Sequence, residues 1–265
     1  KLENIVAGKY LQDLNLKIHA GEIMAIAGVE GNGQEDLEYI LSGIIQPKKG
    51  KILLKSRSES KYIDNGKSTD SLFQDITNFS SKNKNKNHIS IVPGDRHKHG
   101  LVLDFDINDN AIIRSLNDKK FIKFSVINNR EKKLFSKKII EEYDVRGSRE
   151  GNAMARTLSG GNQQKAIVGR EFLSDHDLIV VVQPTRGLDV GAINMIHKQI
   201  INEKKKGRAV LLISYELDEV IALADTIAVI NKGKIVGLKP AVEFGREEIG
   251  LLMAGLNAKG EVYEK

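Results

Sequence analysis

A serine, two glycines and an amide residue stand together at the predicted start of a helix, an arrangement suited to holding an anion. Residues 158–165 read LSGGNQQK and lead into the helical pattern of residues 166–173. The serine caps the helix, the glycines let backbone N–H groups approach a ligand, and the helix dipole adds positive potential. An ordinary serine-capped helix after a glycine turn is the alternative. The candidate residues are Ser159, Gly160, Gly161, Asn162 and Gln163.

A second glycine-rich loop follows the apolar run at residues 23–27 and precedes a predicted helix at residues 36–42. Its spacing follows the frame G-x-x-x-x-G-K-[ST] of a phosphate-binding loop. Gln34 stands where that frame has lysine, and Glu35 stands where it has serine or threonine. A turn that binds no ligand is therefore the alternative. The candidate phosphate-binding residues are Gly28, Gly31, Asn32, Gly33, Gln34 and Glu35.

Glu35 opposes phosphate binding if its carboxylate faces the ligand. Like charges about 4 Å apart repel by roughly 4 kcal/mol at an effective dielectric constant near 20. The side chain avoids this repulsion only by turning away or by pairing with a cation.

An apolar run at residues 178–182 is followed by QPTRGLD, in which Asp189 is the notable carboxylate. Together with LSGGNQQK, this order of motifs closely resembles the ATP-binding cassette (ABC) family, and within it the importers of simple sugars and nucleosides. The resemblance extends from about residue 14 to residue 237 and gives Asp189 the place of the D-loop aspartate. It implies an α/β, P-loop NTPase-like fold with a mostly parallel core sheet, an antiparallel β region and a helical subdomain.

Three positions of the resemblance lack groups that hydrolysis needs. Active members carry Asp and then Glu at the end of the Walker B strand, for magnesium and for polarising water. This chain has Val182 and Gln183 there, and Tyr215 stands where ABC ATPases normally have histidine. No residue is therefore a firm catalytic candidate, and the sequence indicates no metal ligand set.

Residues 93–101 read PGDRHKHGL and resemble the Q-loop of the sugar and nucleoside branch, which commonly begins P-E-D-R and ends in G-L. Gly94 replaces the family's glutamate, so a side chain that reaches metal or water is missing. Asp95 and Arg96 remain candidates, and Arg96 offers a phosphate contact. The neighbouring histidines are interpreted as part of a solvated loop. Upstream, Tyr10 is a candidate for stacking on adenine, with packing at a strand end as the favoured interpretation.

The combined pattern predicts that this chain completes the ATP site of another domain. In the family, two nucleotide-binding domains face each other head to tail, and each ATP lies between the P-loop of one and the signature of the other. The chain resembles the second, degenerate half of such an importer ATPase, weak or inactive alone, with ATP as cofactor and Mg²⁺ at the partner's site. Expected partners are a second nucleotide-binding half, transmembrane permease subunits and, indirectly, a solute-binding protein, at the cytoplasmic face of the membrane.

Two other classes of function stay open. One is a standalone or non-transport ABC ATPase associated with ribosomes or DNA. The other is a nucleotide-free interaction domain.

The chain has 265 residues, of which 40% are hydrophobic, with a net charge of +6. The apolar fraction is sufficient for a globular core. The lysine runs are interpreted as a solvated face, with an anionic membrane surface or nucleic acid as alternatives. Nucleic acid is not an expected partner, because no recognised binding motif and no interleaved aromatic residues accompany the lysines. The lack of cysteine fits a reducing compartment. No apolar run reaches the roughly 20 residues that a membrane span needs. Because the first residue is Lys1 and not methionine, we expect the sequence to be a fragment.

The predicted elements divide the chain into three parts. Residues 1–100 and 158–240 are expected to form the ATP-binding core, residues 101–157 a helical subdomain, and residues 241–265 a polar C-terminal tail. Residues 56–88 are rich in serine, lysine and asparagine and are expected to form a surface loop, with a short helix around residues 71–78.

Overall fold

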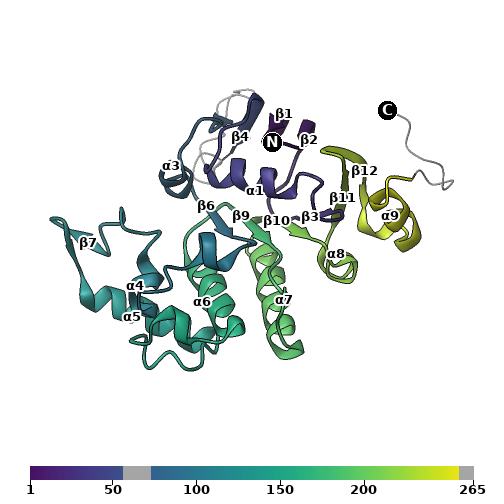
Figure 1. Cartoon of the computed structure of the whole chain (residues 1–265). Coiled ribbons are helices and arrows are strands. Elements are labelled where there is room, and N and C mark those ends of the chain that lie inside the picture. The colour runs from purple at the N-terminus through teal and green to yellow at the C-terminus, as the bar shows by residue number, and fades with distance from the viewer. Residues whose placement is uncertain (56–72, 257–265) are drawn as a thin grey trace. The chain divides into compact units, whose positions relative to one another are not determined.

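The computed structural model describes residues 1–55 and 73–256, so most of the predicted loop at 56–88 and the end of the predicted tail lie outside the described residues (Figure 1). The chain divides into two compact units. The first comprises residues 1–89, 176–182 and 201–265, and the second comprises residues 90–175 and 183–200. No helix in the described ranges is long and apolar enough to cross a membrane.

The core of the first unit is a sheet with strand order β12-β11-β3-β10-β9-β6, in which β6 contributes only Ile89 to this unit. Strands β11, β3, β10 and β9 pair in parallel, and β12 joins β11 antiparallel. The apolar runs of β3 and β9 are buried at every residue, because a parallel sheet is covered on both faces. The strands are β3 (Ile23–Ala27), β6 (Ile89–Val92), β9 (Leu178–Val182), β10 (Ala209–Ser214), β11 (Thr226–Asn231) and β12 (Lys234–Pro240).

A second sheet in this unit is antiparallel, with strand order β2-β1-β4-β5. Along β2, Leu14 and Leu16 are buried while Asn15 is exposed, which is the alternation of a strand with one covered face. The strands are β1 (Leu2–Ala7), β2 (Leu11–Leu16), β4 (Lys49–Leu54) and β5 (Gln74–Asp75).

The short helix expected around residues 71–78 is wrong over the described part of that range. Residues 74–75 form β5, and the Asp75 carboxylate accepts the Thr77 N–H at 2.9 Å, a local bond that favours a turn over a helix. Helix α3 (Ser81–Lys86) lies instead where a loop was expected. Its Lys84 is buried and donates to the carbonyl of Ile40 in α1 (Gln34–Ser42), whose C-terminal end attracts cations.

Two helices near the chain end were not foreseen from the sequence. Helix α8 (Leu217–Leu223) packs on β3 and β10, and α9 (Arg246–Met253) packs on β11 and β12. Ile249 and Leu252 are the buried residues of α9, three positions apart on one face. A short 3-10 turn, η4 (Ala241–Glu243), precedes α9, so the described part of the predicted polar tail includes an ordered helix.

The second unit is mainly helical. Helices α4 (Ile107–Ile112), α5 (Asn129–Glu142) and α6 (Gly160–Leu173) pack together. Close approach of α5 to α6 requires Gly169, where an added Cβ would lie 2.8 Å from Ile139 and 2.9 Å from Tyr143. The predicted α/β fold class, with a mostly parallel sheet, an antiparallel region and helical parts, is confirmed. The remaining elements are η2 (Arg96–Gly100), β7 (Ile122–Lys123), β8 (Val126–Ile127), η3 (Ala155–Thr157) and α7 (Val190–Lys205), which begins in this unit.

Candidate functional site

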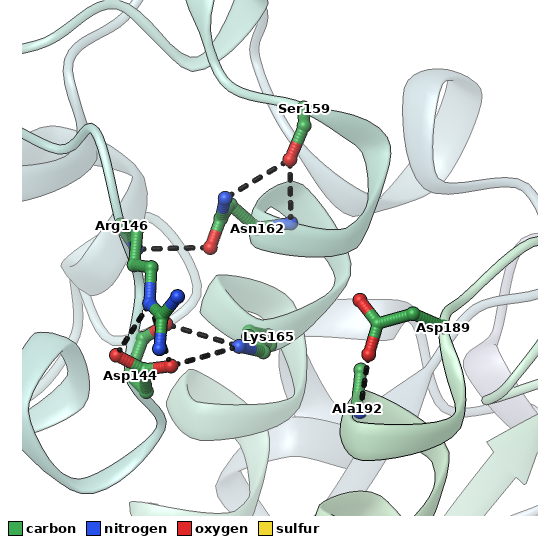
Figure 2. A network of polar contacts seen from close by, with 7 residues as sticks. All are labelled: Asp144, Arg146, Ser159, Asn162, Lys165, Asp189 and Ala192. Carbon is green, nitrogen blue, oxygen red and sulfur yellow. Dashed lines mark hydrogen bonds and ion pairs between the residues drawn. The ribbon is translucent and has the colours of Figure 1, made fainter.

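Ser159 caps helix α6, as the sequence predicts. Its Oγ accepts the backbone N–H of Asn162 at 3.4 Å and the side-chain amide of Asn162 at 2.9 Å. The side-chain oxygen of Asn162 accepts the backbone N–H of Arg146 at 2.9 Å. Figure 2 shows that Asn162 therefore joins the start of the signature helix to a neighbouring turn.

This neighbouring turn, at residues 143–147, has a fixed backbone and outward-facing charges. Tyr143 and Val145 are buried, and the Val145 N–H donates to the Ile140 carbonyl of α5 at 3.0 Å. Between these anchors, Asp144 adopts a left-handed φ of 50°. The side chains of Asp144 and Arg146 are consequently 55% and 78% exposed.

Asp144 is the shared anion of two cations. Its carboxylate lies 3.0 Å from Arg146 Nε and 3.3 Å from Lys165 Nζ, and Lys165 also donates to the Asp144 carbonyl at 3.2 Å (Figure 2). Hydrogen bonds from Arg146 and Lys165 lower the pKa of Asp144. The hydrogen bond to Asp144 raises the pKa of Arg146, with a smaller contribution from the charge of Asp189. Two cations against one carboxylate leave this trio with an excess positive charge at neutral pH.

These side chains line a surface pocket of about 390 Å³. Asp189 lies at its edge, where its Oδ1 accepts the Ala192 N–H at 2.9 Å at the start of α7 (Figure 2). The structure thus brings three of the predicted signature residues, Ser159, Gly161 and Asn162, and the D-loop candidate Asp189 to one pocket, while Gly160 and Gln163 do not line it. The lining residues are Asp144, Arg146, Ser159, Gly161, Asn162, Lys165, Asp189, Gly191, Ala192 and Met195.

The predicted Q-loop residues have different surroundings. Arg96 lies against the first signature glycine, because a Cβ on Gly160 would be 2.6 Å from a terminal guanidinium nitrogen. Asp95 instead caps η2, where its Oδ1 accepts the N–H groups of Lys98 and His97 at 3.0 Å each. These bonds, that of Lys98 first, lower the pKa of Asp95. Arg96 therefore adjoins the signature, while Asp95 is engaged in its own turn.

Gln163 points into the protein. It is buried, its Nε2 donates to the Ala155 carbonyl at 2.9 Å, and its Oε1 lies 2.9 Å from His97 Nε2. The residue therefore connects the signature helix to η2 and is not a lining residue of the pocket. Within residues 1–55 and 73–256, no group of three metal-ligating side chains is found.

The glycine-rich loop of the first unit is filled by one of its own side chains. Gln34 is 1% exposed, its Oε1 accepts the Asn32 N–H at 3.1 Å, and its Nε2 donates to the Val29 carbonyl at 3.1 Å. Gly28 leaves room for this amide, because a Cβ there would lie 2.7 Å from Gln34 Nε2. Gln34 thus occupies the Asn32 N–H, a backbone donor to which a bound phosphate would otherwise be hydrogen-bonded.

The neighbouring loop residues also bind to protein groups. The Asn32 side chain donates to the Val29 carbonyl at 3.1 Å and accepts the Lys232 N–H at 2.7 Å. Glu35 turns along α1, where its Oε1 accepts the Tyr39 hydroxyl at 2.5 Å. This is one of the two ways, identified from the sequence, in which Glu35 avoids repelling a ligand.

Tyr10 lies on the turn between β1 and β2. Its backbone N–H donates to the carboxylate of Asp36 at 2.7 Å, which ties the turn to α1. Tyr10 is 40% exposed, and the Lys9 ammonium lies 5.0 Å from the centroid of its ring. The adenine-stacking role stays a prediction.

The residues at the places that the resemblance gives to the Walker B acids and the histidine are Val182, Gln183 and Tyr215. Val182 is buried at the end of β9. Gln183 follows it with a left-handed φ of 47°, and its Nε2 is buried without a hydrogen-bond partner among the described residues. Tyr215 is half-buried between β10 and α8.

The residues of the first unit's loop do not fit a magnesium-bound triphosphate. Magnesium in P-loop sites is held by a hydroxyl and a carboxylate, and a lysine ammonium contacts the phosphates. The corresponding positions here are Glu35, Val182 and Gln34. At the signature, the Ser159 hydroxyl and the first N–H groups of α6 do fit a phosphate oxygen.

Sequence reasoning missed Asp144, Arg146 and Lys165 as site residues. Lys165 had a readable signal, since it follows Gly161 by four positions on a helix and shares its face. Asp144 and Arg146 reach the pocket through the packing of α5 on α6, which depends on contacts between distant residues.

The chain matches known proteins along most of its length. The family model described as ABC transporter matches residues 11–186. The guanosine import ATP-binding protein NupO of Bacillus subtilis (strain 168) is 43% identical over 249 residues, which is 94% of this chain and 45% of that protein. A putative carbohydrate transport ATP-binding protein of Mycoplasma pneumoniae is 42% identical over 240 residues, or 91% of this chain and 39% of that protein. The chain spans less than half the length of these curated relatives.

Solved structures show the same fold. The dimeric, post-hydrolysis state of the ATP-binding cassette MJ0796 bound to ADP and Pi has a TM-score of 0.68 at 19% identity, covering 91% of this chain and 98% of that one. An ATP-binding subunit of an ABC transporter has a TM-score of 0.70 at 17% identity, covering 96% and 98%. The fold is therefore that of an ABC ATPase. Because the family model covers more than half of the sequence, this chain belongs to the ABC transporter family.

Proposed function

We propose that this chain is a nucleotide-binding domain of an ABC importer for sugars or nucleosides, which couples ATP binding and hydrolysis to solute uptake. In this proposal it is the half with degenerate Walker A and Walker B motifs. It supplies its LSGGNQQ signature to an ATP site whose phosphate loop belongs to a partner domain. Alone, the chain hydrolyses ATP weakly or not at all.

The observation that carries the proposal is the Gln34 amide inside the chain's own phosphate loop. That amide accepts a hydrogen bond from the Asn32 N–H and donates one to the Val29 carbonyl. Glu35 has no hydroxyl that could bind a metal ion, and its carboxylate is hydrogen-bonded to Tyr39. The signature, in contrast, borders a polar pocket of about 390 Å³. The chain therefore retains the groups that complete a neighbour's site and lacks those that hold its own nucleotide.

The names of the relatives support the solute class. One is described as a guanosine importer component, one as a carbohydrate transport protein and one as the nucleoside import protein NupA of Lactococcus lactis. All three are described as ATP-binding proteins.

The proposal includes specific partners and a location. ATP and Mg²⁺ are held chiefly by the phosphate loop of the second nucleotide-binding half, and the assembly docks on transmembrane permease subunits fed by a solute-binding protein. The chain lies peripherally at the cytoplasmic face of the cell membrane.

The proposal also gives each part of the chain a role. Residues 1–100 and 158–240 act as the ATP-binding core, residues 101–157 as the helical subdomain and residues 241–265 as the tail. The proposed contacts to the partner's nucleotide are Ser159, Gly160, Gly161 and Asn162, supported by Gln163, Asp189 and Arg96.

The test places a negative charge at the second signature glycine without disturbing the fold. Among the described residues, an added Cβ at Gly161 meets only Leu188 Cδ2, at 3.7 Å, so a side chain fits there. In an assembly of this chain with the half that carries an intact P-loop, Gly161→Asp should weaken binding of a non-hydrolysable ATP analogue by about a hundredfold, because like charges meet. The matched variant Gly161→Ala should stay within about threefold of the parent.

Two outcomes would overturn the proposal. One is an affinity in the Gly161→Asp assembly equal to that of the Gly161→Ala assembly. The other is robust, magnesium-dependent ATP turnover by this chain alone that disappears when Gln34 is replaced. Strong, salt-sensitive binding of RNA or DNA in place of nucleotide-dependent assembly would favour the non-transport class.

A further inference from the structure

We propose that Arg146 and Lys165 form a cationic contact for the phosphates of the nucleotide that enters the signature pocket, and that Asp144 competes with that nucleotide for both cations. The inference rests on the proposed function, because it takes the partner's ATP as the ligand of this pocket. It assigns a binding role to Asp144 and Arg146, which lie outside the LSGGNQQK stretch, and to Lys165, its last residue.

Lys165 is held at the pocket wall by the helix that carries the signature. It follows Gly161 by four residues, so its side chain rises from the same face of α6. The side chain is 14% exposed, and its ammonium contacts only Asp144 among the described residues, at the carboxylate (3.3 Å) and at the carbonyl (3.2 Å). A cation is thus positioned about one helical turn beyond Gly161.

Arg146 has donors that no group in the described part of the chain uses. Its Nε contacts Asp144, and its two terminal nitrogens make no hydrogen bond or ion pair within the described ranges. The side chain is 78% exposed, while the backbone N–H at its base is fixed to Asn162 at 2.9 Å. The planar guanidinium can offer paired N–H donors to a phosphate, which is the geometry that arginine recognises best.

Asp144 determines how strongly the two cations attract an anion. Its carboxylate neutralises one of the two positive charges and would itself repel an arriving phosphate. The other acidic side chain of the pocket, Asp189, accepts the Ala192 N–H at 2.9 Å and keeps its charge, but it makes no ion pair with Arg146 or Lys165. Removal of the Asp144 charge therefore raises the positive potential of the pocket and frees both cations for the ligand.

The test measures equilibrium affinity for a non-hydrolysable ATP analogue, by titration calorimetry, in the assembly with the intact-P-loop half. Arg146→Gln and Lys165→Gln should each weaken binding by about three- to tenfold, because each removes a charge-assisted hydrogen bond. Asp144→Asn should tighten binding by about threefold at low salt, and all three effects should shrink at high salt. Arg149→Gln is the matched control, since Arg149 is an exposed arginine near the same turn that does not line the pocket.

The outcomes separate this inference from the proposed function. If Gly161→Asp abolishes analogue binding while Arg146→Gln and Lys165→Gln bind like Arg149→Gln, the cationic contact is wrong and the proposed function stands. If Gly161→Asp has no effect either, both fail. Weaker binding by Asp144→Asn at low salt would overturn the competitor role. Thermal unfolding of the isolated variants checks folding. Asp144→Asn and Arg146→Gln change exposed groups and should leave the midpoint nearly unchanged, whereas Lys165 is 14% exposed and Lys165→Gln should lower it slightly.

Discussion

The two glycine-rich helix starts of this protein differ in what occupies the space beside the helix end. At α1, the residue before the helix is Gly33, which has no capping side chain, and Gln34 folds back into the loop. At α6, Ser159 caps the helix from outside, and Gly161 and Asn162 border a pocket. Glycine spacing alone therefore supplies backbone N–H donors. The adjoining side chains determine whether those N–H groups are hydrogen-bonded within the protein or remain open to a pocket.

The two regions also differ in how far their side chains are buried. Gln34 and Asn32 are both buried, and the loop is attached to the β11–β12 turn through the Lys232 N–H. Asn162 and Gly161 are partly exposed, and the charges beside them face solvent. We expect changes at the first region to alter stability and changes at the second to alter assembly with nucleotide.

The largest expected effect comes from restoring the missing groups in the first loop. Gln34→Lys combined with Glu35→Ser should increase the ATP affinity of the isolated chain by about a hundredfold or more, because an ammonium replaces an amide and a hydroxyl that can hold magnesium replaces a carboxylate that turns away to Tyr39. Titration calorimetry with Mg-ATP measures the change. Glu35→Ser alone is the control and should gain less. Unchanged affinity in the double variant would mean that the loop cannot open around phosphate.

A methyl group at one glycine of each region should have unequal effects on stability. Gly33 has a φ of 105°, and a Cβ there would lie 2.8 Å from Leu11, so Gly33→Ala should lower the free energy of unfolding by about 3 kcal/mol. Gly161→Ala should change it by less than about 1 kcal/mol. Urea unfolding of the two variants provides the measurement, and equal losses would contradict the division into structural and binding loops.

Removing an amide from each region gives a smaller contrast. Gln34→Leu leaves the buried Asn32 N–H without its acceptor, while the Val29 carbonyl keeps its bond from the Asn32 side chain. We expect a loss of about 2 kcal/mol in unfolding free energy. Asn162→Ala removes bonds at a partly exposed position and should cost about 1 kcal/mol or less. A larger loss for Asn162→Ala would reverse the comparison.

The smallest expected effect is that of metal removal. A chelator of Mg²⁺ should shift the unfolding midpoint of the isolated parent chain by less than about 1 °C, because ligand linkage stabilises only a protein that binds the ligand. In the Gln34→Lys, Glu35→Ser variant with ATP, the same chelator should lower the midpoint measurably. A chelator-sensitive parent chain would indicate a metal site outside the motifs considered above.

Much of the fold was predictable because the signals were local. The runs at residues 23–27 and 178–182 are continuous and apolar, and both are buried strands. The serine before two glycines predicts the cap of α6, which is present. These elements depend on neighbouring residues and on the period of the apolar pattern.

The rest depended on contacts between distant residues. Helix α3 has an asparagine- and lysine-rich sequence, and it is anchored by a bond from Lys84 to a carbonyl forty-four positions earlier. The pocket charges at Asp144 and Arg146 reach the signature because Gly169 lets two helices approach. The inward direction of Gln34 likewise follows from the small size of Gly28 and from the fixed position of Asn32. Composition and spacing carry no information on any of these three arrangements.

Because Lys84 is hydrogen-bonded to the C-terminal end of α1, its reactivity reports on the helix that follows the glycine-rich loop at residues 28–33. Burial lowers the pKa of Lys84 to about 8, and its amine is covered by protein, unlike the exposed lysines at positions 82 and 86. An amine-reactive label should therefore modify Lys84 only when α3 detaches from the helix that begins at Gln34. Mass spectrometry of that single lysine would follow loosening of the loop's support without any change to the loop itself.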